Sequence, residues 1–196
     1  PLLASYEGST TDNIYGGDTA IYSQACNEWS ACHRYIQELA TDNGPSAPGT
    51  DALHVYSNGP VPPSDDGHIG FYSGINVNLN GFQDIAVFTD LSFDVKLGPT
   101  AVFTDLKVRL EGLGSDQFNN VTLNVSDFVT LDNTWQTVTI PLNLFTAGSG
   151  QIVDINNVST IVLNTDAAQL DMVDLYIDNV VLETVVNSVN DWTLFE

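Results

Sequence analysis

The segment DLSFDVKL, residues 90–97, alternates polar and apolar side chains at every position. In an extended chain Leu91, Phe93 and Val95 would lie on one face, and the polar residues between them would lie on the other. Such alternation is typical of a strand in an antiparallel sheet that has one buried face and one solvated face. The segment therefore predicts a β-strand and sets a period of two with which the rest of the chain can be compared.

The same period of two recurs through the central and C-terminal parts of the chain. Clusters of Gly, Asn, Asp and Pro separate the alternating segments, as turns separate strands. About eight such strands predict an all-β chain, folded as a two-sheet antiparallel β-sandwich of the jelly-roll type. Besides 90–97, the alternating segments are 52–57, 68–79, 105–112, 121–125, 136–141, 160–164 and 174–183.

One segment departs from this alternation. Between Glu28 and Leu39 the apolar side chains recur at the spacing of a helix face, so we expect one short amphipathic helix there. The Gly and Pro residues of TDNGPSAPG, residues 41–49, would end it. We assign residues 10–43 to a loop and helix insertion in a single 196-residue domain, and residues 184–196 to a linker or the start of a following module.

The two cysteines of the chain, Cys26 and Cys32, lie in this insertion. In a secreted protein such a closely spaced pair favours a disulfide, which would hold the start of the helix. The alternative is a metal site formed by Cys26, Cys32 and His33, for which no fourth ligand stands at a suitable spacing. We expect the disulfide and a secreted, extracellular protein.

Acidic residues dominate the charge balance, with 25 Asp and Glu against 4 Lys and Arg and a formal net charge of −21. Nucleic acid and anionic membranes are bound through Lys and Arg, so a surface this negative argues against both as partners. The acids would serve solubility or hold Ca²⁺. The chain starts without a signal-peptide pattern, so we expect a removed signal or a module cut from a longer protein.

Four stretches, in order, carry a resemblance to a known family: DLSFDVKL, DNTWQTVTIPLNLF, INNVSTIVLNTD and LYIDNVVLE. The series resembles the galactose-binding-like jelly-roll carbohydrate-binding modules of secreted polysaccharide-degrading enzymes. The likeness covers residues 53–183, and SYEG, residues 5–8, is weakly similar to the first strand of that family. The resemblance implies a monomeric module that binds polysaccharide or oligosaccharide and is covalently linked to catalytic or repeated modules.

The resemblance also implies a structural Ca²⁺. In modules of this kind the ion commonly joins an acid of the first strand to the Asp of the last, and the matching residues here are Glu7 and Asp178. Asp51, or backbone carbonyls beside it, would help to complete the roughly six to eight oxygen ligands that Ca²⁺ takes. The alternative is that Asp178 caps a β-bulge together with Asn179.

The candidates for sugar binding are aromatic and polar side chains. Pyranose rings stack on aromatic rings, and their hydroxyls bind polar groups. In the insertion Trp29 and Tyr35 would wall a cleft, unless Trp29 packs with Ile36 on the helical stripe. Trp135 matches a position that is usually structural in the family, and we exclude it. The candidates on outward strand faces are Tyr72, Asn76, Asn78, Arg109 and Glu111. The alternative for these faces is a solvated surface with cross-strand ion pairs.

The sequence contains no motif that points to catalysis. Among 25 acids some pair of carboxylates always exists, so the pair that a glycosidase needs is uninformative. No G-x-S-x-G, P-loop or H-E-x-x-H occurs. We therefore predict a non-catalytic carbohydrate-binding module that targets a secreted enzyme to a neutral or weakly charged polysaccharide. The alternatives are a Ca²⁺-stabilised domain of a cell-surface adhesin and a small jelly-roll glycosidase or lyase.

Overall fold

The strands of the chain pair in two sheets. The computed structural model describes residues 2–7, 15–23, 35–41, 43–46, 50–57, 73–101, 106–113, 120–147, 152–165 and 173–184. Its strands are β1 (Leu2–Ala4), β2 (Thr19–Ser23), β3 (Tyr35–Ala40), β4 (Ala52–Ser57), β5 (Ser73–Gln83), β6 (Asp90–Leu97), β7 (Leu106–Gly112), β8 (Thr122–Asn124), β9 (Gln136–Pro141), β10 (Val158–Thr165) and β11 (Asp174–Glu183). Two short 3-10 helices, η2 (Val125–Asp127) and η3 (Leu142–Thr146), follow β8 and β9. No helix in these ranges is long and apolar enough to cross a membrane.

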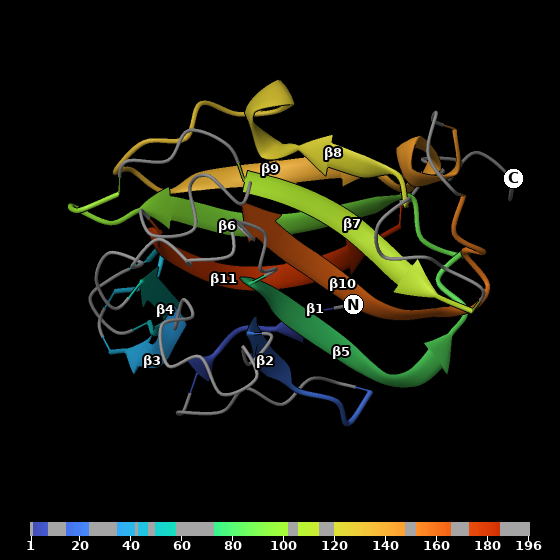
Figure 1. Cartoon of the computed structure of the whole chain (residues 1–196), viewed down its shortest axis with the longest axis horizontal. Coiled ribbons are helices and arrows are strands. Elements are labelled where there is room, and N and C mark those ends of the chain that lie inside the picture. Colours follow the sequence, from blue (N-terminus) through green and yellow to red (C-terminus); the bar gives the residue numbers. More distant parts are fainter. Residues whose placement is uncertain are drawn as a thin grey trace, which may run out of the picture.

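The two sheets lie in two layers (Figure 1). The six-stranded sheet has the order β3-β4-β11-β6-β9, with β1 paired to β11, and the five-stranded sheet has the order β2-β5-β10-β7-β8. The pairings between described strands are antiparallel. In Figure 1, β7 and β10 cross in front of the strands of the other sheet. The predicted all-β, two-sheet antiparallel sandwich is confirmed.

The core lies between the sheets and consists of the alternating apolar residues. In the six-stranded sheet Leu91, Phe93 and Val95 are at most 1% exposed, and in the five-stranded sheet Val108 and Leu110 are equally buried. Each sheet therefore contributes one face to the core and directs its other face outward, as strands with a period of two require. The outward faces are where ligand-binding side chains can lie.

The predicted helix is wrong where the structure can be compared with it. Residues 35–39 belong to strand β3, whose pairing with β4 runs from Tyr35 opposite Ser57 to Ala40 opposite Ala52. A few apolar residues at helical spacing do not distinguish helix from strand, and here the open edge of β4 satisfies the backbone groups of β3. The rest of the predicted helix, residues 28–34, lies outside the described residues.

Candidate functional site

The outer face of the five-stranded sheet brings together several of the predicted sugar-binding residues. The register places Val162 of β10 between Asn76 of β5 and Arg109 of β7. Ile161 and Leu163, the neighbours of Val162 along β10, belong to the core, so Val162 points outward. Asn76, Val162 and Arg109 therefore form one row across the outer face of this sheet.

A second row lies beside the first on the same face. Asn78 of β5 stands opposite Thr160 of β10, which stands opposite Glu111 of β7. The side-chain amide of Asn78 also donates to Asp18 Oδ1 at 3.0 Å, which joins this row to residues next to β2. Four predicted residues, Asn76, Asn78, Arg109 and Glu111, thus share one face, although only the sheet register brings β5 and β7 to the two sides of β10.

The guanidinium of Arg109 is held in place by two neighbours. Its Nε donates to Glu111 Oε1 at 3.0 Å, and its Nη2 lies 2.9 Å from the same oxygen. Its Nη1 donates to Asn164 Oδ1 at 3.3 Å. Arg109 is only 7% exposed, so the planar group is fixed before any ligand arrives. Sequence reasoning missed Asn164. The signal that could have identified it is its position next to apolar Leu163 in a predicted strand, which places its polar side chain on the outer face.

Asn76 has a buried polar atom without a partner. Its side-chain oxygen is buried and has no hydrogen-bond partner among the described residues. Leaving a buried acceptor unpaired costs about 1–3 kcal/mol. A hydroxyl donated by a ligand would remove this cost, which is the interaction that a sugar-binding face offers.

The predicted calcium ligands also come together, in a different part of the sandwich. Asp178 of β11 is 1% exposed and stands opposite Asp94 of β6 in the six-stranded sheet. Glu7 accepts the backbone N–H of Asp51 with both carboxylate oxygens, each at 3.2 Å. Burial, helped by the charges of Glu7, Asp94 and Asp51 and opposed by the hydrogen bond from the N–H of Asn179, raises the pKa of Asp178 to about 7. We call Glu7, Asp51, Asp94 and Asp178 the acid cluster.

The bulge that was the alternative for Asp178 is present as well. The register of β11 with β6 shifts after Asp178, and Asn179 adopts a positive φ of 48°. The N–H of Asn179 donates to Asp178 Oδ1 at 2.7 Å, and its side-chain amide donates to Asp94 Oδ2 at 2.8 Å. Thr137 also donates its hydroxyl to Asp94 Oδ1 at 2.6 Å, so both oxygens of Asp94 accept hydrogen bonds, as does one oxygen of Asp178.

The acid cluster has the negative charge that a cation needs, but its side chains are not arranged as a complete set of metal ligands. Within the described ranges no three His, Cys, Asp or Glu side chains are arranged closely enough to hold a metal ion. The buried carboxylate of Asp178 and the three acids that raise its pKa are nevertheless the hard oxygen donors that Ca²⁺ prefers. Asp94 was missed by sequence reasoning, because only the register of β6 with β11 places it here.

Several predicted residues cannot be compared with the structure. Tyr72, Trp29, Cys26 and Cys32 lie outside the described residues, so the disulfide stays a prediction. Tyr35 begins β3 and therefore belongs to the six-stranded sheet rather than to the sheet of Asn76 and Arg109; its side chain is not among the described ones.

Solved structures share the sandwich. The family 30 carbohydrate-binding module of the cellulosomal cellulase Cel9D-Cel44B of Clostridium thermocellum is 18% identical, with 86% of this chain and 92% of that chain covered and a TM-score of 0.60. The solution structure of CtCBM11 is 18% identical, with 95% of each chain covered and a TM-score of 0.57. An exo-β-agarase is 14% identical over 93% of this chain and 25% of its own, with a TM-score of 0.58. At these identities the likeness establishes the fold.

Sequence comparison identifies the family. No curated protein sequence matches the chain significantly. Residues 18–184, which are most of the chain and include nearly all of its described strands, match the family Carbohydrate binding domain 30. This match confirms the resemblance inferred from the four ordered stretches and the prediction of a non-catalytic carbohydrate-binding module. The chain belongs to the Carbohydrate binding domain 30 family.

Proposed function

We propose that the outer face of the five-stranded sheet is the surface that binds polysaccharide. The observation that carries this proposal is the row of Asn76, Val162 and Arg109 across β5, β10 and β7. The row offers a buried acceptor that has no partner among the described residues, at Asn76, and fixed N–H donors at Arg109. Preorganised polar groups lose little freedom on binding, so they recognise the hydroxyl pattern of a sugar at low entropic cost.

The charges on this face support a neutral or weakly charged polysaccharide. Glu111 contacts the guanidinium of Arg109 at 2.9 Å, and the pair cancels its own charge, which leaves Lys107 of β7, opposite Asn164, as a further cation on this face. The chain as a whole carries a formal net charge of −21 and repels polyanions. A polymer rich in uronate groups would find neither a free cation in the Arg109–Glu111 pair nor a favourable long-range field.

The module would act by holding an enzyme near its substrate. Linking a binding module to a catalytic module raises the effective substrate concentration without changing the chemistry. The family 30 module of the Clostridium cellulase and the exo-β-agarase, a longer chain that this fold covers only in part, support such a linkage. We infer that this chain is likewise part of a secreted enzyme that acts on polysaccharide outside the cell.

Affinity electrophoresis tests the proposed face. Gels containing a cellulose-type β-glucan, xylan, agarose or polygalacturonate identify the neutral polymer that retards the wild-type chain. With that polymer, Asn76→Ala and Arg109→Ala should each weaken retention about tenfold, because each removes hydrogen bonds to the ligand. Asn143→Ala, at an exposed position in η3, is the matched control and should bind as the wild type does. Unchanged retention of both face variants would overturn the assignment.

We also propose that the acid cluster binds a structural Ca²⁺ through Glu7, Asp51 and Asp178. Three properties support it: the burial of Asp178, the convergence of acids around it, and the preference of Ca²⁺ for carboxylate and carbonyl oxygens. The ion would offset the repulsion between these carboxylates. It would stabilise the fold without touching the sugar, because Asp178 and Asp94 lie on β11 and β6 of the six-stranded sheet, whereas the proposed binding face belongs to the other sheet.

A further inference from the structure

A continuous row of side chains crosses the outer face of the six-stranded sheet. The register aligns Glu38 of β3, His54 of β4, Tyr176 of β11 and Lys96 of β6. The imidazole of His54 stacks on the ring of Tyr176 at a centroid distance of 4.2 Å and an interplanar angle of 4°. Lys96 Nζ lies 4.5 Å from the Tyr176 ring centre and 5.0 Å from that of Trp135. We call these residues the cross-sheet row.

The cross-sheet row is unsuited to binding a sugar ring. Stacking with a pyranose needs an open aromatic face. One face of Tyr176 is covered by His54 and Lys96 lies over the ring, while His54 also stacks on Tyr56 at 4.7 Å. The ring of Tyr176 is therefore engaged by its neighbours, and the contacts of His54 point to a function of the row within the sheet.

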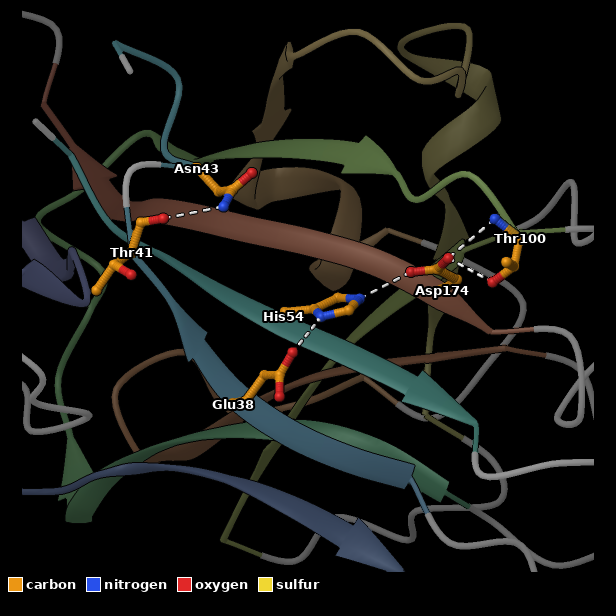
Figure 2. Close-up of polar contacts among 6 residues, drawn as sticks. All are labelled: Glu38, Thr41, Asn43, His54, Thr100 and Asp174. Carbon is orange, nitrogen blue, oxygen red and sulfur yellow. Dashed lines mark hydrogen bonds and ion pairs between the residues drawn. The ribbon is translucent and has the colours of Figure 1, made fainter. Parts of the chain in front are cut away.

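His54 lies between two carboxylates. Its Nδ1 is 2.9 Å from Glu38 Oε1, and its Nε2 is 2.8 Å from Asp174 Oδ1 (Figure 2). A carboxylate is only an acceptor, and a neutral imidazole carries a single N–H. Both contacts can be hydrogen bonds only when both ring nitrogens are protonated. In that form the ring, whose side chain is 14% exposed, bridges β3, β4 and β11.

Asp174 is an acceptor that is fixed in position. Thr100 donates its backbone N–H to Asp174 Oδ2 at 3.0 Å and its hydroxyl to the same oxygen (Figure 2). Burial raises the pKa of Asp174, but the hydrogen bonds from Thr100 and His54 and the charge of His54 lower it by more, so the carboxylate is ionised. There is no space for a side chain at Gly98, where a Cβ atom would overlap the carboxylate of Asp174.

We propose that His54 is a protonation-dependent clamp, which as an imidazolium ties edge strand β3, through Glu38, to β11, and which releases Glu38 when it loses one proton. The single N–H that is left goes to Asp174, whose side chain is 6% exposed and held by Thr100. Glu38, with its side chain 54% exposed, turns to solvent.

The release of Glu38 affects β3 first. Among the described strands β3 pairs with β4 alone, so within this part of the chain it has no second neighbour in the sheet to hold it. The other titratable or charged groups that face the imidazole are Tyr56 from β4, Tyr176 from β11 and Lys96 beyond Tyr176. None of these three replaces Glu38, because Tyr56 and Tyr176 stack on the ring and Lys96 is a cation. Loss of the proton therefore loosens the edge of the sheet.

The test combines NMR of the ring with hydrogen exchange of the strands. The chain has three His residues, so His33→Asn/His68→Asn leaves His54 as the single imidazole. We expect both of its ring nitrogens to be protonated at the acidic end of a series from pH 5 to 9. Across the pH step in which the ring loses a proton, protection factors of the β3 amides should fall about three- to tenfold relative to those of the opposite edge strand, β9.

Two variants separate the clamp from a merely structural role. His54→Phe keeps an aromatic ring on Tyr176 but has nothing to titrate, and Glu38→Gln changes only the exposed partner. In His54→Phe we expect low and pH-independent protection of β3. In Glu38→Gln we expect the pH step to disappear, because an amide can accept from a protonated Nδ1 and donate to an unprotonated one. A ring with one proton throughout the series, or the same pH step in His54→Phe, would overturn the proposal.

Discussion

Replacing Asp178 with Asn tests the acid cluster, because the substitution keeps the shape of the side chain and removes its charge. In metal-free buffer at pH 8 the wild-type carboxylate is ionised although it is 1% exposed and surrounded by Glu7, Asp51 and Asp94. An uncompensated buried charge destabilises a fold. We therefore expect Asp178→Asn to be more stable than the wild type when EDTA is present, the reverse of the usual effect of a mutation in a buried strand.

The expected difference in stability between Asp178→Asn and the wild type follows from the pKa of Asp178. Raising it from 3.8 to about 7 corresponds to at most about 4 kcal/mol. We reduce this to about 2 kcal/mol, because solvent and salt screen the more exposed partners such as Glu7. Since the pKa in the folded state is the higher one, the contribution is fully present below pH 3.8 and is lost as the pH rises through about 7. Asn does not titrate, so Asp178→Asn does not lose stability at this position as the pH rises.

Calcium should reverse the order of the two proteins. A ligand present at 100 times its Kd stabilises the state that binds it by about 2.7 kcal/mol. The wild type should gain this stabilisation, and Asp178→Asn should gain little, because it lacks a carboxylate ligand. The assay is thermal unfolding followed by intrinsic fluorescence at pH 8, with EDTA or with Ca²⁺. A difference of about 2 kcal/mol corresponds to roughly 4–8 °C in Tm for a domain of this size.

The control and the refuting results are equally specific. Asp127→Asn, at an exposed position in η2, removes the same charge outside the acid cluster and should match the wild type under both conditions. If Asp178→Asn were less stable than the wild type in EDTA, the hydrogen bond from Asn179 would outweigh the repulsion, and the electrostatic reasoning would be wrong. If Ca²⁺ left the wild-type Tm unchanged, the cluster would not be a calcium site.

Two further predictions concern single contacts. Glu111→Gln removes the counter-charge of Arg109. In affinity gels, retention by the neutral polysaccharide should therefore fall about 3- to 10-fold, while retention by polygalacturonate rises. An unchanged ratio of the two retentions would show that Glu111 does not set the charge preference. Gly98→Ala places a Cβ atom against Asp174 and should lower the free energy of unfolding in urea by about 1–3 kcal/mol, whereas wild-type stability would show that Asp174 shifts freely.

The sequence predicts strands well where the alternation is long and strict. The predicted bounds of β6, β9 and β11 agree with the structure to the residue. β1 was missed because LLA has three residues and no alternation, and β2 because TAIYS is short and isolated. β3 was misassigned because its final state depends on pairing with β4, which local spacing does not encode.

The candidate site could be predicted only in part, because it depends on register. Alternation alone indicates that Asn76 and Arg109 point outward, and this is confirmed. It does not indicate that Asn164 meets Arg109 or that Asp94 meets Asp178. The contact between His54 and Asp174 joins residues 120 positions apart and requires both the order and the register of β4 and β11.

The two outer faces differ in how they use their polar groups, and this difference is the strongest argument for which face binds. On the six-stranded sheet both ring nitrogens of His54 contact carboxylates, and its ring stacks on Tyr56 and Tyr176. On the five-stranded sheet the Asn76 oxygen is buried without a partner among the described residues. Thr50 Oγ1 and Asn120 Oδ1 are likewise buried without a partner among the described residues, so what distinguishes the Asn76 oxygen is its place in the outward row with Arg109, where a ligand hydroxyl would pair with it. A polysaccharide hydroxyl at Asn76 would complete the hydrogen bonding that the fold leaves open.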